Sequence, residues 1–326
     1  MELITQPILV LVENDRTESV PTLSAASSKL LHLASTLTEG PVVALSVSPE
    51  VDEEGCRAGG AQTVYVPQAS GYSPAVPAAV ADVARIALTQ LGNSGAVLTT
   101  SNYLGRAVTA MLSATSAAGG AVDVSSLRVD DGRIVAEKSA LGGSWATAFH
   151  VTHGFPVLAL NSGVGPDEGP AGEGVVVPIA AELSPGALGV EVVSTRSEPK
   201  GTRISLGDAD VVVVGGRGVD GDFTLVEQLA DALGGAVGAT RVACDEGWVE
   251  RSAQIGQTGV TVAPKLYIGL GVSGAVHHTC GMLGSEVIVA VVDDPDAPIL
   301  ELADFAVVGD LNEVVPQLLE TFEQLG

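Results

Sequence analysis

Cysteines are scarce in this chain of 326 residues, which has three of them, Cys56, Cys244 and Cys280. Their odd number and scattered positions exclude a fully paired disulfide framework and provide no pair with the spacing of a zinc site. His277 and His278 precede Cys280, but adjacent helical residues point about 100° apart, so we expect no metal site there. The chain therefore suits a reducing compartment, and we expect a cytoplasmic protein.

Basic residues are also few, since 15 Lys and Arg stand against 39 Asp and Glu, for a formal net charge of -24. A phosphate backbone or an anionic membrane would repel such a chain, so we expect no nucleic-acid binding. Apolar runs such as Ile8–Val12 are too short to cross a bilayer, and Met1–Pro7 lacks the pattern of a signal peptide. We therefore expect a soluble protein without membrane insertion.

Hydrophobic residues, in contrast, make up 46% of the chain, which also contains 40 Gly. This balance is typical of short buried strands that alternate with helices, so the predicted class is α/β. In the first part, short apolar runs predict strands at Ile8–Val12, Val42–Val47, Ala96–Thr99 and Val157–Leu160. Helical spacing predicts helices at Thr22–Leu37, Pro74–Leu91 and Asn102–Ala118, which completes a doubly wound unit.

From about Val122 to Val151 the pattern changes to strands without good helices, with Asp131-Gly132 as a hairpin turn. We expect an antiparallel extension of the first domain, with Trp145 in its core. A polar stretch follows, and we place the domain boundary near Pro199 to Ile204, so that residues 1–200 and 201–326 form two domains.

The second domain starts a new α/β rhythm. Strands are predicted at Val211–Val214, Leu266–Gly271, Val287–Val292 and Phe305–Val308, with helices at Asp222–Leu233 and from Glu313 onward. We expect a Rossmann-like domain with a parallel sheet.

Two G-x-G-x-x-G motifs follow strands of this second domain, and each is followed by a predicted helix. They consist of Gly216, Gly218 and Gly221, and of Gly269, Gly271 and Gly274. In this context glycines let a pyrophosphate approach the backbone amides at a helix N-terminus, so two motifs in one sheet favour a dinucleotide. The alternative is that glycines in so glycine-rich a chain match by chance and only form tight turns.

The residues after the first motif favour a flavin over a nicotinamide. A nicotinamide enzyme wants an acidic residue roughly 20 residues later to hold a ribose, whereas here the chain reads Gly238 to Arg241. A cation such as Arg241 suits a flavin because reduction places negative charge on the N1 and C2 carbonyl region of the ring. A nicotinamide-dependent oxidoreductase and a nucleotide-sensing module remain the alternatives.

Several motifs of the second domain, taken together, closely resemble the electron transfer flavoprotein alpha (large) subunit family. They are Gly215–Gly218, Val237–Arg241, Ile255–Gly259, Gly271–His278 and Asp294–Ile299, in the family's order and spacing. Ile8–Glu13 and Gly105-Arg106 resemble the family's N-terminal domain less specifically. The resemblance covers essentially the whole chain.

The resemblance implies that the second domain binds FAD. Carried over position by position, the FAD-binding residues are Arg217, Thr240, Arg241, Ile255, Gly256, Gln257, Thr258, Ser273, Gly274, Ala275, Val276, His277, His278, Val292, Asp310 and Leu311. The family usually has Gln at His277 and Asn at Val292, and each departure changes one expected polar contact.

The expected roles follow from side-chain chemistry. Arg241 would lie against the flavin ring, and Thr258 would offer its hydroxyl to the flavin N5 or C4 carbonyl. A protonated or donating His278 would approach the C2 carbonyl. Arg217 and the amides of Ser273 and Gly274 would neutralise the pyrophosphate. Asp310 would reach ribose hydroxyls, although by itself it reads as the N-cap of the last helix.

The resemblance also implies an electron carrier rather than an enzyme, and no catalytic constellation can be assembled from the sequence. The implied partner is a smaller beta subunit that binds AMP. The implied donors are flavin dehydrogenases such as the acyl-CoA dehydrogenases of fatty acid β-oxidation, and the implied acceptor is a membrane quinone oxidoreductase.

Overall fold

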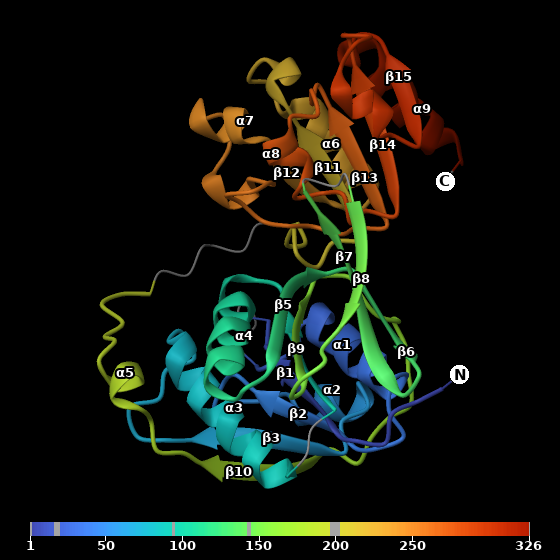
Figure 1. Cartoon of the computed structure of the whole chain (residues 1–326). Helices are drawn as coiled ribbons and strands as arrows, with labels where there is room; N and C mark the ends of the chain where they lie inside the picture. The colour runs from blue at the N-terminus through green and yellow to red at the C-terminus, as the bar shows by residue number, and fades with distance from the viewer. Residues whose placement is uncertain (1, 16–19, 93–94, 142–144, 196–202, 326) are drawn as a thin grey trace. The chain divides into compact units, whose positions relative to one another are not determined.

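The computed structural model describes residues 2–15, 20–92, 95–141, 145–195 and 203–325 (Figure 1). The chain divides into two compact units, unit 1 with Met1–Ser139 and Ala146–Glu198, and unit 2 with Ala140–Trp145 and Pro199–Gly326. The domain boundary expected between residues 200 and 201 lies outside the described residues, so its position stays a prediction.

Unit 1 is built on a seven-stranded sheet in the order β10-β3-β2-β1-β4-β9-β5, and its strand pairs are parallel. Its strands are β1 (Ile8–Val12), β2 (Val42–Ser46), β3 (Thr63–Gln68), β4 (Ala96–Thr100), β5 (Gly119–Val124), β9 (Pro156–Leu160) and β10 (Val175–Ala180). Every residue of β1, β2 and β4 is buried, as expected for strands covered on both faces.

Helices cover the two faces of this sheet. They are α1 (Ala25–Ser35), α2 (Glu53–Ala58), α3 (Pro77–Leu91), α4 (Tyr103–Thr115) and the short α5 (Pro185–Leu188). Side-chain caps explain where two of them begin: the Ser24 side chain accepts from the amide of Ser27, and the Asn102 side chain accepts from that of Gly105. The three helices predicted for this region are present: α1 and α4 are shorter than predicted at both ends, and α3 begins three residues later than predicted and ends at Leu91 as predicted.

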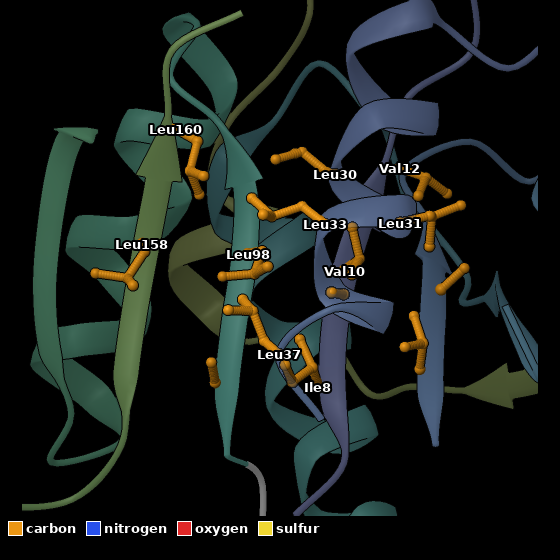
Figure 2. Packing of buried hydrophobic residues seen from close by; sticks show 14 of the residues in the cluster. Ile8, Val10, Val12, Leu30, Leu31, Leu33, Leu37, Leu98, Leu158 and Leu160 are labelled. Carbon is orange, nitrogen blue, oxygen red and sulfur yellow. The ribbon is translucent and has the colours of Figure 1, made fainter. Parts of the chain in front are cut away.

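The side chains of β1 divide between two cores because successive residues point to opposite faces. Ile8, Val10 and Val12 pack on the α1 side, whereas Leu9 and Leu11 belong to a second cluster on the other face. Figure 2 shows the α1 side, where leucines of the helix meet residues of the strands. Burial on both faces accounts for the nearly all-apolar strand sequences.

The predicted antiparallel extension is present as a sheet in the order β6-β7-β8, with bounds Ser126–Asp130, Arg133–Ala140 and Trp145–His150. Asp131 and Gly132 have φ of 49° and 66°, and they join β6 to the antiparallel β7 as predicted. The prediction that Trp145 lies in the core is wrong, because its exposed fraction is 64%. Trp145 starts an edge strand with exposed neighbours, and no apolar layer covers it within the described residues.

Unit 2 is a five-stranded parallel sheet in the order β12-β11-β13-β14-β15. Its strands are β11 (Val211–Gly215), β12 (Ala236–Ala239), β13 (Leu266–Leu270), β14 (Val287–Val292) and β15 (Phe305–Val308). Its α-helices are α6 (Thr224–Ala232), α7 (Arg241–Asp245), α8 (Val276–Thr279) and α9 (Leu311–Leu325), with 3-10 turns at Arg217–Val219, Arg251–Ala253 and Pro298–Glu301. The strand order confirms the predicted Rossmann-like sheet, and it reverses between β11 and β13.

None of the helices in the described parts of the chain is both long and apolar enough to cross a bilayer.

A truncation in the core of unit 1 tests this packing. Leu98, in β4, is fully buried, so Leu98→Ala is expected to lower the free energy of unfolding by about 2–5 kcal/mol through lost contacts and a cavity. Tyr103 is 81% exposed, and Tyr103→Ala should change the free energy by less than about 0.5 kcal/mol. Urea titration of both variants measures the difference, and equal effects would contradict the assigned burial.

Candidate functional site

The candidate FAD-binding residues gather at one edge of the unit 2 sheet. They follow the carboxyl ends of all five strands: Arg217 after β11, Thr240 and Arg241 after β12, Ser273 to His278 after β13, Val292 at the end of β14, and Asp310 and Leu311 after β15. In open α/β sheets this edge, at the point where strand order reverses, is where ligands bind. That point lies between β11 and β13, which carry the two glycine motifs.

The two glycine motifs pack against each other, backbone to backbone. A Cβ at Gly216 would lie 2.2 Å from the carbonyl oxygen of Gly271, and one at Gly218 would lie 2.7 Å from the Gly271 Cα. The Gly218 amide donates to the same carbonyl over 2.9 Å. Gly274 is held in the same way, with its Cβ position 2.3 Å from the Ile299 nitrogen. The close approach that requires these glycines is thus between loops, whereas the sequence had assigned it to a pyrophosphate.

The segment after β13 presents free donors. The amides of Ser273 through His277 have no acceptor within the described residues, as is usual where a helix such as α8 begins. Ser273 and His277 are exposed, and so is Arg217 in the neighbouring turn. Amides and a guanidinium in one place can neutralise a phosphate group.

A tight turn at residues 254–260 contains the candidates Ile255 to Thr258 and contacts the candidates at the end of β12 and in α8. The Ile255 amide donates to the Ala239 carbonyl at the end of β12 over 2.9 Å, and the Gln257 amide donates to the His277 carbonyl over 2.8 Å. Gly256 has φ of 136°, and a Cβ there would lie 2.3 Å from the same His277 oxygen, so only glycine fits. The turn is therefore held between the end of β12 and α8.

Arg241 begins α7 and is mainly exposed. Its Nε lies 3.1 Å from Oδ2 of Asp245, one helical turn later, and Arg251 donates to the other oxygen of Asp245 over 2.5 Å. Exposed ion pairs of this kind contribute little to stability, so the Arg241 guanidinium can turn toward a ligand without a large loss.

The Thr240 hydroxyl indicates whether a ligand fits this site. Its Oγ1 is buried and has no hydrogen-bond partner within the described residues. Buried hydroxyls are nearly always hydrogen-bonded, so an orphan at this edge indicates a partner that the protein does not supply. Together with Arg217, Arg241 and the free amides, it matches the polar groups of a dinucleotide. The residues present fit FAD.

His278 lies in an unexpected place, because its ring is 5% exposed and both of its nitrogens have protein partners. Nδ1 is 3.0 Å from the Ile255 carbonyl oxygen, and Nε2 is 2.8 Å from the Tyr267 hydroxyl. Because a carbonyl only accepts, Nδ1 carries the ring hydrogen, and the neutral ring accepts the Tyr267 hydrogen at Nε2. Gly269 leaves room for the Tyr267 ring, whose Cε1 is 3.1 Å from the position of a Cβ at Gly269.

The environment of His278 disfavours its charged form. Burial lowers its pKa to about 4 from an ordinary 6.5, although the hydrogen bond to the Ile255 carbonyl opposes the shift. Burial also raises the pKa of Tyr267, which stays neutral. A protonated His278 facing a flavin, one form of the sequence expectation, is therefore disfavoured at neutral pH. A contact of the neutral ring with the C2 carbonyl stays a prediction.

The two positions that depart from the family pattern differ in setting. His277 is exposed, and its Nδ1 lies 2.7 Å from Oε1 of Gln257, so these two candidates are paired. Val292 is 4% exposed and belongs to the core of unit 2, and its side chain has no hydrogen-bonding group.

Asp310 fills one of the two roles considered for it, that of the N-cap of α9, and its contact with ribose hydroxyls stays a prediction. Its Oδ1 accepts from the Asn312 amide over 2.8 Å, and its carbonyl accepts from the amides of Glu313 and Val314 in α9. Asp310 thus stabilises the start of this helix. The next residue, Leu311, packs in the core.

No group of three or more His, Cys, Asp or Glu that could hold a metal exists among the described residues.

The sequence did not single out four residues that organise the site: Tyr267, Asp245, Arg251 and Gln254. In the sequence, Tyr267 cannot be distinguished from the other residues of an apolar strand. Gln254, at 2% exposed, is a buried amide just before the Ile255–Gly259 motif, and its burial could not be read from the sequence.

The buried His278 predicts a pH-dependent stability. Its folded-state pKa of about 4 is below the ordinary 6.5, so the unfolded chain binds more protons between these values. Its contribution is complete above about pH 6.5 and is lost as the pH falls toward about 4. Between about pH 7 and pH 4.5, the protein should lose about 2–3 kcal/mol more unfolding free energy than His278→Gln. Urea titrations at both pH values measure this, and parallel losses would show that His278 is not buried as described.

Two family models match most of this chain. The family model described as the electron transfer flavoprotein domain matches residues 8–184, and that described as the electron transfer flavoprotein FAD-binding domain matches residues 205–283. The second match contains the glycine motifs, the turn and α8, whereas Val292, Asp310 and Leu311 lie beyond it.

Two curated relatives match nearly the whole chain, and a third matches part of it. The chain is 39% identical over 321 residues to the electron transfer flavoprotein subunit alpha of Mycobacterium leprae, which covers 96% of each chain. It is 37% identical to that of Mycobacterium tuberculosis, over 97% of this chain and 98% of the relative. The mitochondrial subunit alpha of Arabidopsis thaliana is 54% identical over 127 residues, 38% of this chain and 35% of its own. The chain thus belongs to the electron transfer flavoprotein alpha subunit family, whose members are electron carriers, and contains the family's FAD-binding domain.

Proposed function

We propose that this chain is the FAD-carrying subunit of a heterodimeric carrier, with FAD bound at the carboxyl edge of the unit 2 sheet. The single observation that carries the proposal is the orphaned Thr240 hydroxyl beside Arg241, at an edge that also presents free amides. When bound, FAD accepts and releases electrons one or two at a time. The protein's own residues bind it, orient it and adjust its potential.

The pyrophosphate is assigned to the amides of Ser273 and Gly274, with Arg217 as the cation. These groups lie where the β11 and β13 loops meet, at the reversal of strand order. The ribose hydroxyls are assigned to the Asp310 oxygen that does not cap α9. The remaining candidates, Ile255 to Thr258 and Ala275 to His278, would line the flavin half.

The flavin ring is assigned to the surface between α7 and the 254–260 turn. Arg241 and Thr258 are both exposed there, and the hydrogen bond from Ile255 to Ala239 keeps the turn beside the end of β12. A nicotinamide ligand would favour an acidic residue at the end of β12, but Thr240 and Arg241 follow it. A cation there supports a cofactor that becomes negative on reduction.

The carrier role defines the proposed partners. We assign the contact with an AMP-binding beta subunit to residues 1–200, and FAD to residues 201–326. The proposed donors are flavin dehydrogenases such as acyl-CoA dehydrogenases, and the proposed acceptor is a quinone oxidoreductase at a membrane. The absence of paired cysteines among Cys56, Cys244 and Cys280 supports a cytoplasmic location.

Co-expression with the candidate beta subunit tests the assignment. The purified complex should be yellow, with the absorbance bands of flavin, and should release FAD on denaturation. Arg217→Gln should weaken FAD binding by about three- to tenfold, because one charged contact to the pyrophosphate is lost. A colourless complex that takes up no added FAD but is protected from heat by NAD would contradict the assignment.

A substitution at Arg241 tests its position near the ring. Arg241→Gln should lower the reduction potential of the bound flavin by about 20–45 mV, equivalent to about 1–2 kcal/mol for two electrons, because the reduced form loses a nearby cation. Arg241→Lys keeps the charge and should lower the potential less. Spectroelectrochemical titration of the three proteins measures the difference. An unchanged potential in Arg241→Gln would place Arg241 away from the ring.

A further inference from the structure

A chain of hydrogen bonds links two of the candidate flavin contacts, Arg241 and Thr258. Arg241 and Arg251 share the carboxylate of Asp245, at 3.1 Å and 2.5 Å respectively. Nη1 of Arg251 then donates to Oε1 of Gln254 over 3.0 Å, and Nε2 of Gln254 donates to Oγ1 of Thr258 over 2.9 Å. The chain ends at Thr258, in the same turn whose Gln257 amide donates to the His277 carbonyl of α8.

The direction of the hydrogen bonds in this chain follows from the chemistry of the Arg251 guanidinium. A guanidinium has only hydrogen-bond donors, so the atom of Gln254 that faces Arg251 must be the carbonyl oxygen. The NH2 group of the same amide therefore faces Thr258. Gln254 is 2% exposed, so its amide cannot exchange these partners for water.

The direction of the chain determines what the Thr258 hydroxyl can do. Since Oγ1 accepts a hydrogen from Gln254, its own hydrogen points elsewhere, and it has no acceptor within the described residues. Thr258 is exposed on the candidate flavin surface. Its hydroxyl is thus a donor without an acceptor in the protein, directed to where a ligand acceptor would lie.

We propose that Gln254, oriented by Arg251, is a positioning residue that commits the Thr258 hydroxyl to donate a hydrogen bond to an acceptor atom of the flavin ring. The inference rests on the proposed FAD site and identifies a residue that controls the polarity of one contact in it. Gln254 acts through Thr258 and does not itself touch the cofactor. Asp245 joins the same network to Arg241, so the two flavin contacts share one support.

The nearly isosteric substitution Gln254→Glu reverses the direction of the hydrogen bond between residue 254 and Thr258. In Gln254→Glu, the new carboxylate still pairs with Arg251. The neighbouring cation keeps the carboxylate ionised at about pH 7.5, so it can accept hydrogen bonds but cannot donate one. The Thr258 hydrogen then turns inward to the carboxylate, and the ligand loses its donor. We expect FAD to bind about tenfold more weakly to Gln254→Glu than to wild type, as for loss of one hydrogen bond. Quenching of flavin fluorescence by the complex with the beta subunit measures the affinity.

Gln254→Met is the matched control, because it removes the amide without offering an acceptor. The Thr258 hydroxyl remains free to donate, so binding should weaken only about twofold. Urea titrations of the proteins without FAD check that both variants fold. If Gln254→Glu does not fold, a loss of affinity in Gln254→Met as large as that in Thr258→Val would overturn the proposal.

A double-mutant cycle with Thr258→Val separates positioning from a general structural effect. If Gln254 acts through the hydroxyl, Gln254→Glu should cause no further loss of affinity in the Thr258→Val background. Equal losses in both backgrounds, or equal effects of the Glu and Met substitutions, would overturn the inference. A wild-type complex that binds no FAD would overturn the proposed function together with it, whereas normal FAD binding by wild type and Gln254→Glu alike would overturn the inference alone.

Discussion

The backbone-to-backbone contact of two glycine loops is the constraint on which the rest of the site depends. Gly216 and Gly271 leave no space for a Cβ, and this contact joins the ends of β11 and β13 where strand order reverses. A side chain at either position would separate the loops and move the segment that leads into α8. The free amides of that segment, and the turn bonded to α8, therefore owe their positions to this contact.

Two hydrogen-bonded chains hold the 254–260 turn. One runs from Tyr267 through His278 to the Ile255 carbonyl, and the other from Arg251 through Gln254 to Thr258. Each includes a group of fixed polarity, a carbonyl that only accepts or a guanidinium that only donates, so each chain has one direction. The buried members of these chains, Tyr267, His278 and Gln254, have their hydrogen-bonding groups paired within the protein, which makes the turn rigid.

Charge is distributed in a way that suits the same site. The chain has a formal net charge of -24, yet Arg217 and Arg241 stand exposed at the carboxyl edge of unit 2. A local cation attracts an anionic ligand even on an acidic protein, because the field near a surface is dominated by the closest charges. His278, buried and neutral, adds no charge there. Arg241, assigned to the flavin surface, can thus respond to charge on a reduced cofactor, whereas Arg217 is assigned to the pyrophosphate.

Local patterns in the sequence determined the fold class, most of the parallel strands, the Asp131-Gly132 hairpin and the family, because burial and backbone angles act on neighbouring residues. The parallel strands β3, β5, β10 and β12 were not predicted. They also identified the strand ends at which the candidate site lies. Only the tertiary structure decided that the glycine loops meet each other, that Trp145 is exposed, that His278 is bonded to Tyr267, and that Gln254 faces Arg251. The packing of loops and strand edges, and the hydrogen-bond direction of a buried side chain, depend on which atoms the complete fold places beside them. That information is absent from periodicity and motif spacing.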